Sequence, residues 1–67
     1  MDTVIERLTV ERNELCEKLE KLAAFVGTEP YYRLSGAQQR LLSAQRDVMA
    51  AYHGILDMRI AEINASV

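Results

Sequence analysis

The sequence predicts an all-α fold: two long antiparallel amphipathic helices form a helical hairpin, which assembles into a homo-oligomeric helical bundle. Apolar residues recur at helical spacing over residues about 3–26 and again over about 36–65, and Pro30 lies between them. A chain of 67 residues is expected to form one domain, residues 1–67. Because two helices side by side have no third layer to cover their remaining apolar faces, we expect other copies of the chain to cover them.

The first helix is expected to begin at a capping box, in which Thr3 accepts from the amide of Glu6 and the Glu6 carboxylate accepts from the amide of Thr3. Its apolar stripe alternates spacings of three and four residues once Arg12 fills one gap. The stripe consists of Ile5, Leu8, Leu15, Leu19, Leu22 and Val26. Gly27, directly after the stripe, predicts a left-handed residue that ends the helix.

The connection, residues 27–35, contains Pro30, which prevents the first helix from continuing. Proline can stand early in one short helical turn, and Thr28 is placed to cap such a turn. The following Tyr31 and Tyr32 make the segment too apolar for a free loop. We therefore expect at least one of the tyrosines to pack over the end of the hairpin.

The second helix is expected to begin at another capping box, formed by Ser35 and Gln38. Its stripe is wider than a two-position seam and includes two polar residues, Gln45 and Arg59. The apolar members are Leu41, Leu42, Val48, Met49, Tyr52, Ile55, Leu56, Ile60 and Ile63. A face this wide favours contact with more than one neighbouring helix. Gly54 costs ~1 kcal/mol relative to alanine in mid-helix, which predicts the close approach of another helix there.

Composition and charge exclude several classes of protein. Apolar residues make up 49% and charged residues 27% of a chain with net charge −2, so we expect an ordered protein without the basic footprint that DNA or RNA binding needs. No apolar run is long enough to span a membrane, and the first residues do not resemble a signal peptide. Cys16 is the one cysteine. These features favour a cytoplasmic protein without disulfides.

Neither catalysis nor a metal or other cofactor is expected. Cys16 lies beside Glu17, and a neighbouring carboxylate raises the pKa of a thiol rather than lowering it. His53 is the one histidine, and neither residue belongs to a cluster with metal-ligand spacing. The carboxylates of the second helix are spread along it without a paired acid–base arrangement; they are Asp47, Asp57 and Glu62. We expect a surface or interface role for the histidine and a spare thiol at the cysteine.

The polar residues within the apolar stripes allow two interpretations. Arg12 and Arg59 can pair with carboxylates across an interface and fix its register, as buried polar groups do. Alternatively, two arginines from different chains line a cleft and bind an anion, because guanidinium binds phosphate in a bidentate manner.

Lys18 and Lys21 also allow two interpretations. As solvated residues they pair with Glu14 and Glu17, four positions earlier. As ligand contacts they need another chain to cover that face of the first helix.

The order and spacing of residues over about 6–61 resemble a group of small helical phage proteins, some of them described as related to a crAss-like phage protein. This group includes or borders the anti-CBASS nucleotide sponges. The first helix carries the resemblance through Glu6-Arg7-Leu8, Glu11-Arg12, Glu14-Leu15, Lys18, Lys21-Leu22 and Phe25-Val26. The second carries it through Leu34, Gln39, Leu41-Leu42, Gln45, Met49, Tyr52, Ile55-Leu56 and Arg59-Ile60.

The resemblance implies a homo-oligomer, a hexamer in the sponges, that sequesters cyclic di- or trinucleotide messengers in the host cytoplasm without cleaving them. It would thereby block CBASS-type signalling. Lys18 or Lys21 matches a family lysine on the first long helix that holds cyclic dinucleotides together with an upstream tyrosine. Arg59 matches an arginine of the C-terminal region, near a separate pocket that can take cyclic trinucleotides. The upstream tyrosine of the family has no counterpart. Guanidinium planes, or Tyr31 and Tyr32 from another chain, would then have to stack on the bases.

Two readings without a small ligand remain open from the sequence. The chain can be a structural or adaptor homo-oligomer whose helical faces bind protein partners. It can also be an inhibitor that occludes another protein directly.

Overall fold

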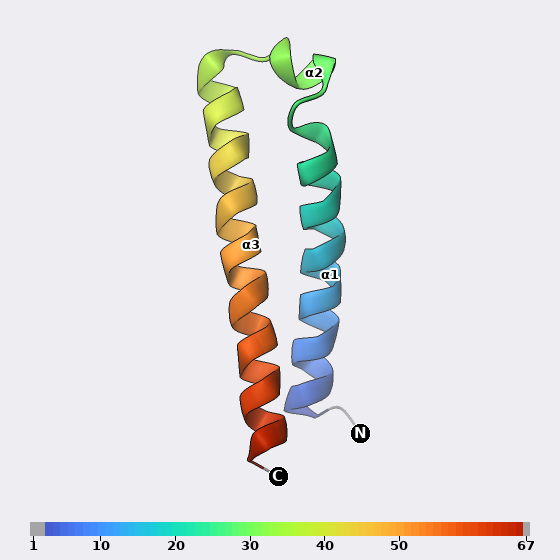
Figure 1. Cartoon of the computed structure of the whole chain (residues 1–67). Helices are drawn as coiled ribbons and strands as arrows, with labels where there is room; N and C mark the ends of the chain where they lie inside the picture. The colour runs from blue at the N-terminus through green and yellow to red at the C-terminus, as the bar shows by residue number, and fades with distance from the viewer. Residues whose placement is uncertain (1–2, 67) are drawn as a thin grey trace.

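The computed structural model describes residues 3–66, which form a helical hairpin with principal extents of 49 × 18 × 13 Å. α1 (Val4–Phe25) and α3 (Gly36–Ala65) lie side by side in opposite directions. α2 (Glu29–Tyr32) is a single turn at the closed end (Figure 1). The expected pair of long helices packed against each other is confirmed, with helix ends close to the expected positions.

Local side-chain contacts explain where the long helices begin. Thr3 Oγ1 accepts from Glu6 N at 3.1 Å, and Glu6 Oε2 accepts from Thr3 N at 3.1 Å, which confirms the first capping box. At the second, Ser35 Oγ accepts from Gln38 N at 3.1 Å, the forward half of the box. Each contact satisfies an amide that the helix itself leaves without a partner.

The connection reverses the chain through a glycine and a capped turn. Gly27 has φ +94°, the left-handed conformation expected at the end of α1. Thr28 accepts from Tyr31 N at 3.4 Å and donates to the carbonyl of Phe25 at 2.7 Å, so it joins α1 to α2. Pro30 lies in the first turn of α2, where its missing N–H costs no hydrogen bond.

Tyr31 closes this end of the hairpin. Its side chain is 7% exposed, its hydroxyl donates to the carbonyl of Gln39 at 2.9 Å, and its ring packs edge-to-face on Phe25 with centroids 6.1 Å apart. Tyr32 is 64% exposed. The expectation that one tyrosine packs over the end of the hairpin is therefore confirmed for Tyr31.

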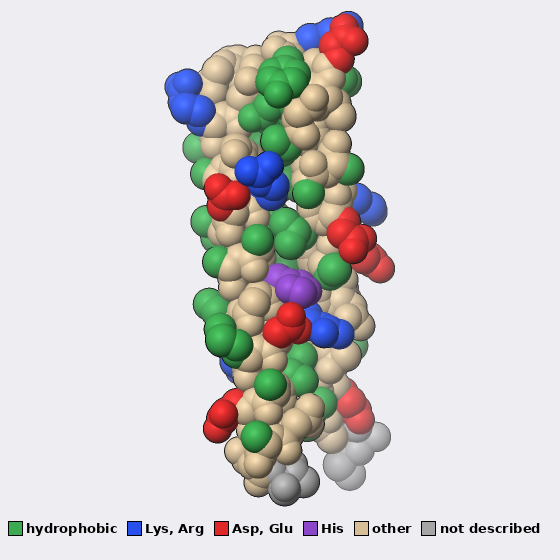
Figure 2. Space-filling view, in the orientation of Figure 1, with side chains coloured by type: hydrophobic (Ala, Val, Ile, Leu, Met, Phe, Trp, Pro, Cys, Tyr) green, Lys and Arg blue, Asp and Glu red, His purple; other side chains and the backbone are tan. Residues whose placement is uncertain are grey.

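The wide apolar face of α3 divides into two parallel rows. The inner row faces α1 and contains Leu42, Arg46, Met49, His53, Leu56, Ile60 and Ile63, all buried or half-buried. The outer row, offset by one residue and exposed, contains Leu41, Gln45, Val48, Tyr52, Ile55, Arg59 and Glu62; we call it the outer seam. In Figure 2, hydrophobic side chains appear both between the helices and along the outer edge of α3. The hairpin thus covers only half of the face.

The expectation for Gly54 is wrong within the hairpin. A Cβ atom added to Gly54 would meet nothing within 4 Å, so α1 does not approach it closely. The reason is its position on α3, because Leu56, two residues away, is the fully buried residue that faces α1.

Candidate functional site

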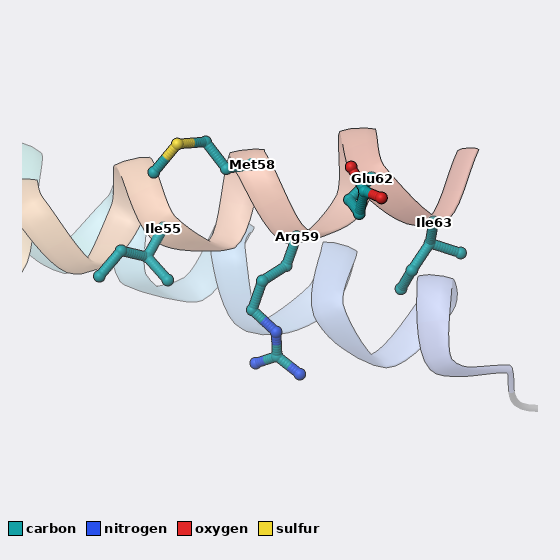
Figure 3. Close-up of a pocket in the computed structure, with 5 residues that line it drawn as sticks. All are labelled: Ile55, Met58, Arg59, Glu62 and Ile63. Atoms are coloured by element: carbon teal, nitrogen blue, oxygen red, sulfur yellow. The ribbon is translucent and has the colours of Figure 1, made fainter. Parts of the chain in front are cut away.

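A shallow hollow of about 550 Å³ lies on the C-terminal half of α3. Its lining residues are Ile55, Met58, Arg59, Glu62 and Ile63. Figure 3 shows the Arg59 side chain extending between Ile55 and Ile63, so a cation projects from an apolar surface. Three of the lining residues belong to the outer seam, the half of α3 that the hairpin leaves uncovered.

The chemistry of this hollow suits a flat anionic ligand. The guanidinium of Arg59 presents planar donors that match the oxygens of phosphate or carboxylate groups. Ile55 is 47% and Met58 65% exposed, which leaves apolar surface beside the cation for an aromatic base. The Glu62 carboxylate at the edge would repel an anion, which restricts the approach to the side of Arg59 and Ile55.

A contact between Tyr52 of the outer seam and Glu11 joins that side of α3 to α1. The Tyr52 hydroxyl donates to Glu11 Oε1. This hydrogen bond raises the pKa of the Tyr52 hydroxyl, and partial burial and the Glu11 charge raise it further, while Arg59 opposes the rise. Tyr52 was expected within the apolar stripe, but its partner was not, because 41 residues separate the two in sequence.

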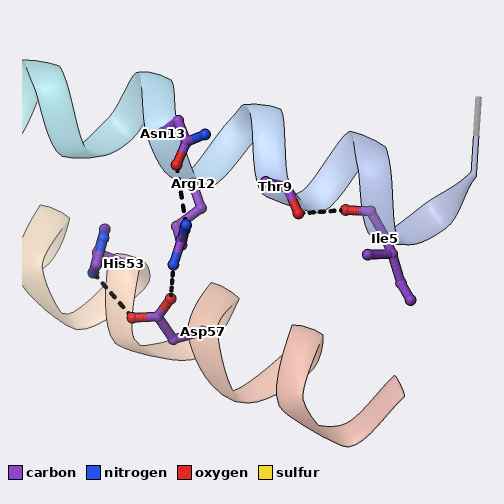
Figure 4. Close-up of polar contacts among 6 residues, drawn as sticks. All are labelled: Ile5, Thr9, Arg12, Asn13, His53 and Asp57. Atoms are coloured by element: carbon purple, nitrogen blue, oxygen red, sulfur yellow. Dashed lines mark hydrogen bonds and ion pairs between the residues drawn. The ribbon is translucent and has the colours of Figure 1, made fainter. Parts of the chain in front are cut away.

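Arg12 is half-buried and pairs with residues of its own hairpin. Its Nη1 lies 3.0 Å from Asp57 Oδ1, and its Nη2 donates to Asn13 Oδ1 at 3.1 Å (Figure 4). His53 Nδ1 lies 3.5 Å from Asp57 Oδ2, so the carboxylate joins two helices and two basic groups. The arrangement matches the register-fixing interpretation of Arg12.

Lys18 and Lys21 are both exposed on α1. Among the residues that the structure describes, neither forms an ion pair, so their ammonium groups remain available. Lys18 lies two helical turns after Glu11, on the same face of α1. Because Glu11 contacts Tyr52, Lys18 is on the same side of the hairpin as Tyr52. Lys21, three residues after Lys18, lies further around the α1 helix axis and faces away from α3.

Within one chain, Lys18 and Arg59 lie far apart. From the contact between Glu11 and Tyr52, Lys18 is seven residues towards the closed end and Arg59 seven residues towards the open end. At 1.5 Å per residue the two levels differ by about 20 Å along the hairpin. Tyr31 and Tyr32 occupy the closed end of the hairpin, so they are further from Arg59 than Lys18 is.

Comparison with known protein families identifies the family of the chain. The family model described as Sequestin matches residues 2–62. The chain belongs to the Sequestin family. Searches of curated proteins and of solved structures gave no match. The family name fits a protein that sequesters a ligand, and the residues that resemble the sponges lie within the matched range.

The Sequestin match extends through both long helices and includes the whole outer seam and Arg59. Within residues 3–66, no helix has the length and hydropathy to cross a membrane. No group of three or more histidine, cysteine, aspartate or glutamate residues in that range could hold a metal ion.

The pKa of the Cys16 thiol in this Sequestin member is raised, as its acidic neighbours predict. Its Sγ lies 3.5 Å from Glu20 Oε1, and this hydrogen bond, with partial burial and the Glu20 charge, raises the pKa of the thiol. Glu20, one turn later on α1, was not the carboxylate singled out from the sequence. The i,i+4 spacing is the signal that could have identified it.

Proposed function

We propose that this Sequestin-family protein binds and sequesters cyclic di- or trinucleotide immune messengers without cleaving them. In this proposal it is a phage protein that acts in the host cytoplasm and blocks CBASS-type signalling. The observation that carries the proposal is the family match over residues 2–62, which contains an arginine projecting from an apolar hollow. We propose that the hollow is where the ligand binds.

A cyclic dinucleotide demands two kinds of contact. It carries two phosphate charges, which the guanidinium of Arg59 can bind through charge-assisted hydrogen bonds worth about 1.5–3 kcal/mol. It also presents two flat bases, which need apolar or planar surfaces. Ile55 and Met58 supply such a surface beside the cation.

One chain is not enough to bury such a ligand. Small-molecule sites typically cover about 70–90% of the ligand surface, whereas the hollow at Arg59 is open to solvent. We therefore propose that several copies, six in analogy with the sponges, close the site. A homo-oligomer would also cover the exposed outer seam, which includes Leu41 and Val48 at 63% and 69% exposure.

Sequestration without cleavage is consistent with the state of the candidate nucleophiles. The pKa of the Cys16 thiol is raised, mainly by its hydrogen bond to Glu20, and a raised pKa disfavours the nucleophilic thiolate. His53 lies against Asp57 in the hairpin. With Glu11 level with Tyr52, it is offset from Cys16 of the opposite helix by about two turns. We propose that the bound nucleotide is returned unchanged when the protein is denatured.

Calorimetry with a set of cyclic di- and trinucleotides tests the site. We expect Arg59→Ala to weaken binding at least 10-fold, about 1.4 kcal/mol, with helicity and oligomer mass unchanged. Arg33→Ala is the matched control, because Arg33 is an exposed arginine at the opposite end that pairs with Glu29. Lys18→Ala, Lys21→Ala and Arg12→Ala complete the series. If Arg59→Ala binds as well as the parent, the hollow is not the site.

A further inference from the structure

One aromatic ring lies close to the hollow at Arg59, and it belongs to Tyr52. The chain has three tyrosines, one phenylalanine and no tryptophan. Three of the four rings gather at the closed end, where Phe25 packs on Tyr31 and Tyr31 on Tyr32, with centroids 6.1 and 5.2 Å apart. Tyr52 precedes Arg59 by seven residues on α3, which is two helical turns, or about 10 Å, along one face.

Ile55 connects the Tyr52 ring to the hollow. It lines the hollow, three residues after Tyr52 and four before Arg59, so the three side chains follow one another along α3. Figure 3 shows the Arg59 side chain beside Ile55. Side chains of a helix lean towards its N-terminal end, which brings the guanidinium of Arg59 closer to Tyr52. The ring and the cation therefore border one continuous apolar surface.

The Tyr52 ring is both held in place and accessible. Its hydroxyl donates to Glu11 Oε1, so the side chain is anchored on α3 by its backbone and on α1 by its hydroxyl. The residue is nevertheless 40% exposed. A ring that is already held loses little conformational entropy when a ligand packs on it. Tyr31, whose hydroxyl is also held, is only 7% exposed and has no surface to offer a base.

We propose that a base of the bound nucleotide stacks on Tyr52, while Arg59 binds the adjacent phosphate and Glu11 holds the ring in position. This inference rests on the proposed function and adds the flat surface that the lining of the hollow lacks. Every base has a π face, so the ring accepts purines and pyrimidines alike. It would also distinguish a nucleotide from inorganic phosphate, which contacts the arginine alone.

Tryptophan fluorescence tests the stacking directly. Because the chain has no tryptophan, Tyr52→Trp introduces a single reporter and keeps a flat ring there. We expect a cyclic dinucleotide to quench its emission on binding, since a stacked base quenches an indole. Tyr32→Trp, at the closed end, should keep its emission. Binding that leaves the emission of Tyr52→Trp unchanged, or that quenches Tyr32→Trp instead, would overturn the proposal.

Calorimetry separates the role of the ring from that of the hydroxyl. Tyr52→Phe keeps the ring, whereas Tyr52→Leu replaces it by an apolar side chain without a flat face. The affinity for a cyclic dinucleotide should fall at most about 3-fold in the first variant and at least about 10-fold in the second. Both should stay helical, because the side chain is partly exposed. Equal losses in the two variants would mean that the hydroxyl matters and the ring does not.

The positioning role of Glu11 is tested by Glu11→Gln in the parent and in Tyr52→Phe. In both backgrounds the substitution removes a negative charge, which favours an anionic ligand equally. In the parent alone it also weakens the hold on the ring. We therefore expect the affinity change to be about 3-fold less favourable in the parent than in Tyr52→Phe. The same change in both backgrounds would reject Glu11 as a positioning residue.

The parent protein distinguishes failure of this inference from failure of the proposed function. If the parent binds cyclic dinucleotides and Tyr52→Leu binds them equally well, the stacking role fails and the proposed function stands. If the parent binds no cyclic di- or trinucleotide in the same calorimeter, both fail.

Discussion

Arg12 of α1 and Asp57 of α3 form an ion pair that joins the two long helices, with Nη1 and Oδ1 3.0 Å apart. The pair stands among apolar neighbours of the inner row and also contacts His53. Because its geometry is satisfied in one alignment of the helices, it favours that register over alignments shifted by a turn.

Asp57→Asn should lower the free energy of unfolding by about 0.5–1 kcal/mol, since both side chains of the pair are partly exposed and water screens the charges. Denaturant unfolding at fixed protein concentration measures this change. Glu29→Gln, which removes the more exposed pair with Arg33, is the matched control and should change stability less. Equal effects of the two substitutions would contradict the register role.

Gly27 and Gly54 should respond to alanine in opposite ways. Gly27→Ala places a Cβ atom at φ +94° and should cost about 1 kcal/mol. Gly54→Ala meets nothing within 4 Å in mid-helix and should stabilise the hairpin by about 0.5–1 kcal/mol. Thermal unfolding of the two variants checks the signs. A destabilising Gly54→Ala would mean that a second copy approaches this glycine.

Glu20→Gln should make Cys16 react faster with iodoacetamide at mildly alkaline pH. The hydrogen bond to Glu20 is the largest cause of the raised thiol pKa, so its weakening increases the thiolate fraction. Alkylation rates measured against pH give a titration curve. The curve of the variant should lie at lower pH than that of the parent, and the two rates should converge once both thiols are ionised. Coincident curves would contradict the contact.

Local signals made the helices predictable from the sequence. The box at Thr3, the left-handed Gly27 and the cap at Thr28 act over three or four residues, so their outcome depends little on the rest of the chain. The partners of Arg12 and Tyr52 could not be predicted in the same way. They depend on the alignment of α1 with α3, and the contacting residues are 45 and 41 positions apart.

The sequence predicted one residue of the candidate site but not which row of α3 would be exposed. Arg59 was singled out because it interrupts an apolar stripe, and it projects from the apolar hollow. The wide stripe did not reveal which half would face α1, because two rows offset by one residue have the same spacing. Burial of Leu56 and exposure of Ile55 distinguish the rows.

Native mass spectrometry with cyclic di- and trinucleotides tests sequestration most directly. We expect an oligomer that gains the mass of intact nucleotide, retains it through buffer exchange and, after heating, releases a compound that elutes with the starting nucleotide. Arg59→Ala should keep the oligomer mass and lose the added nucleotide. An oligomer that stays empty with every nucleotide tested, or that releases a linear product, would contradict the account.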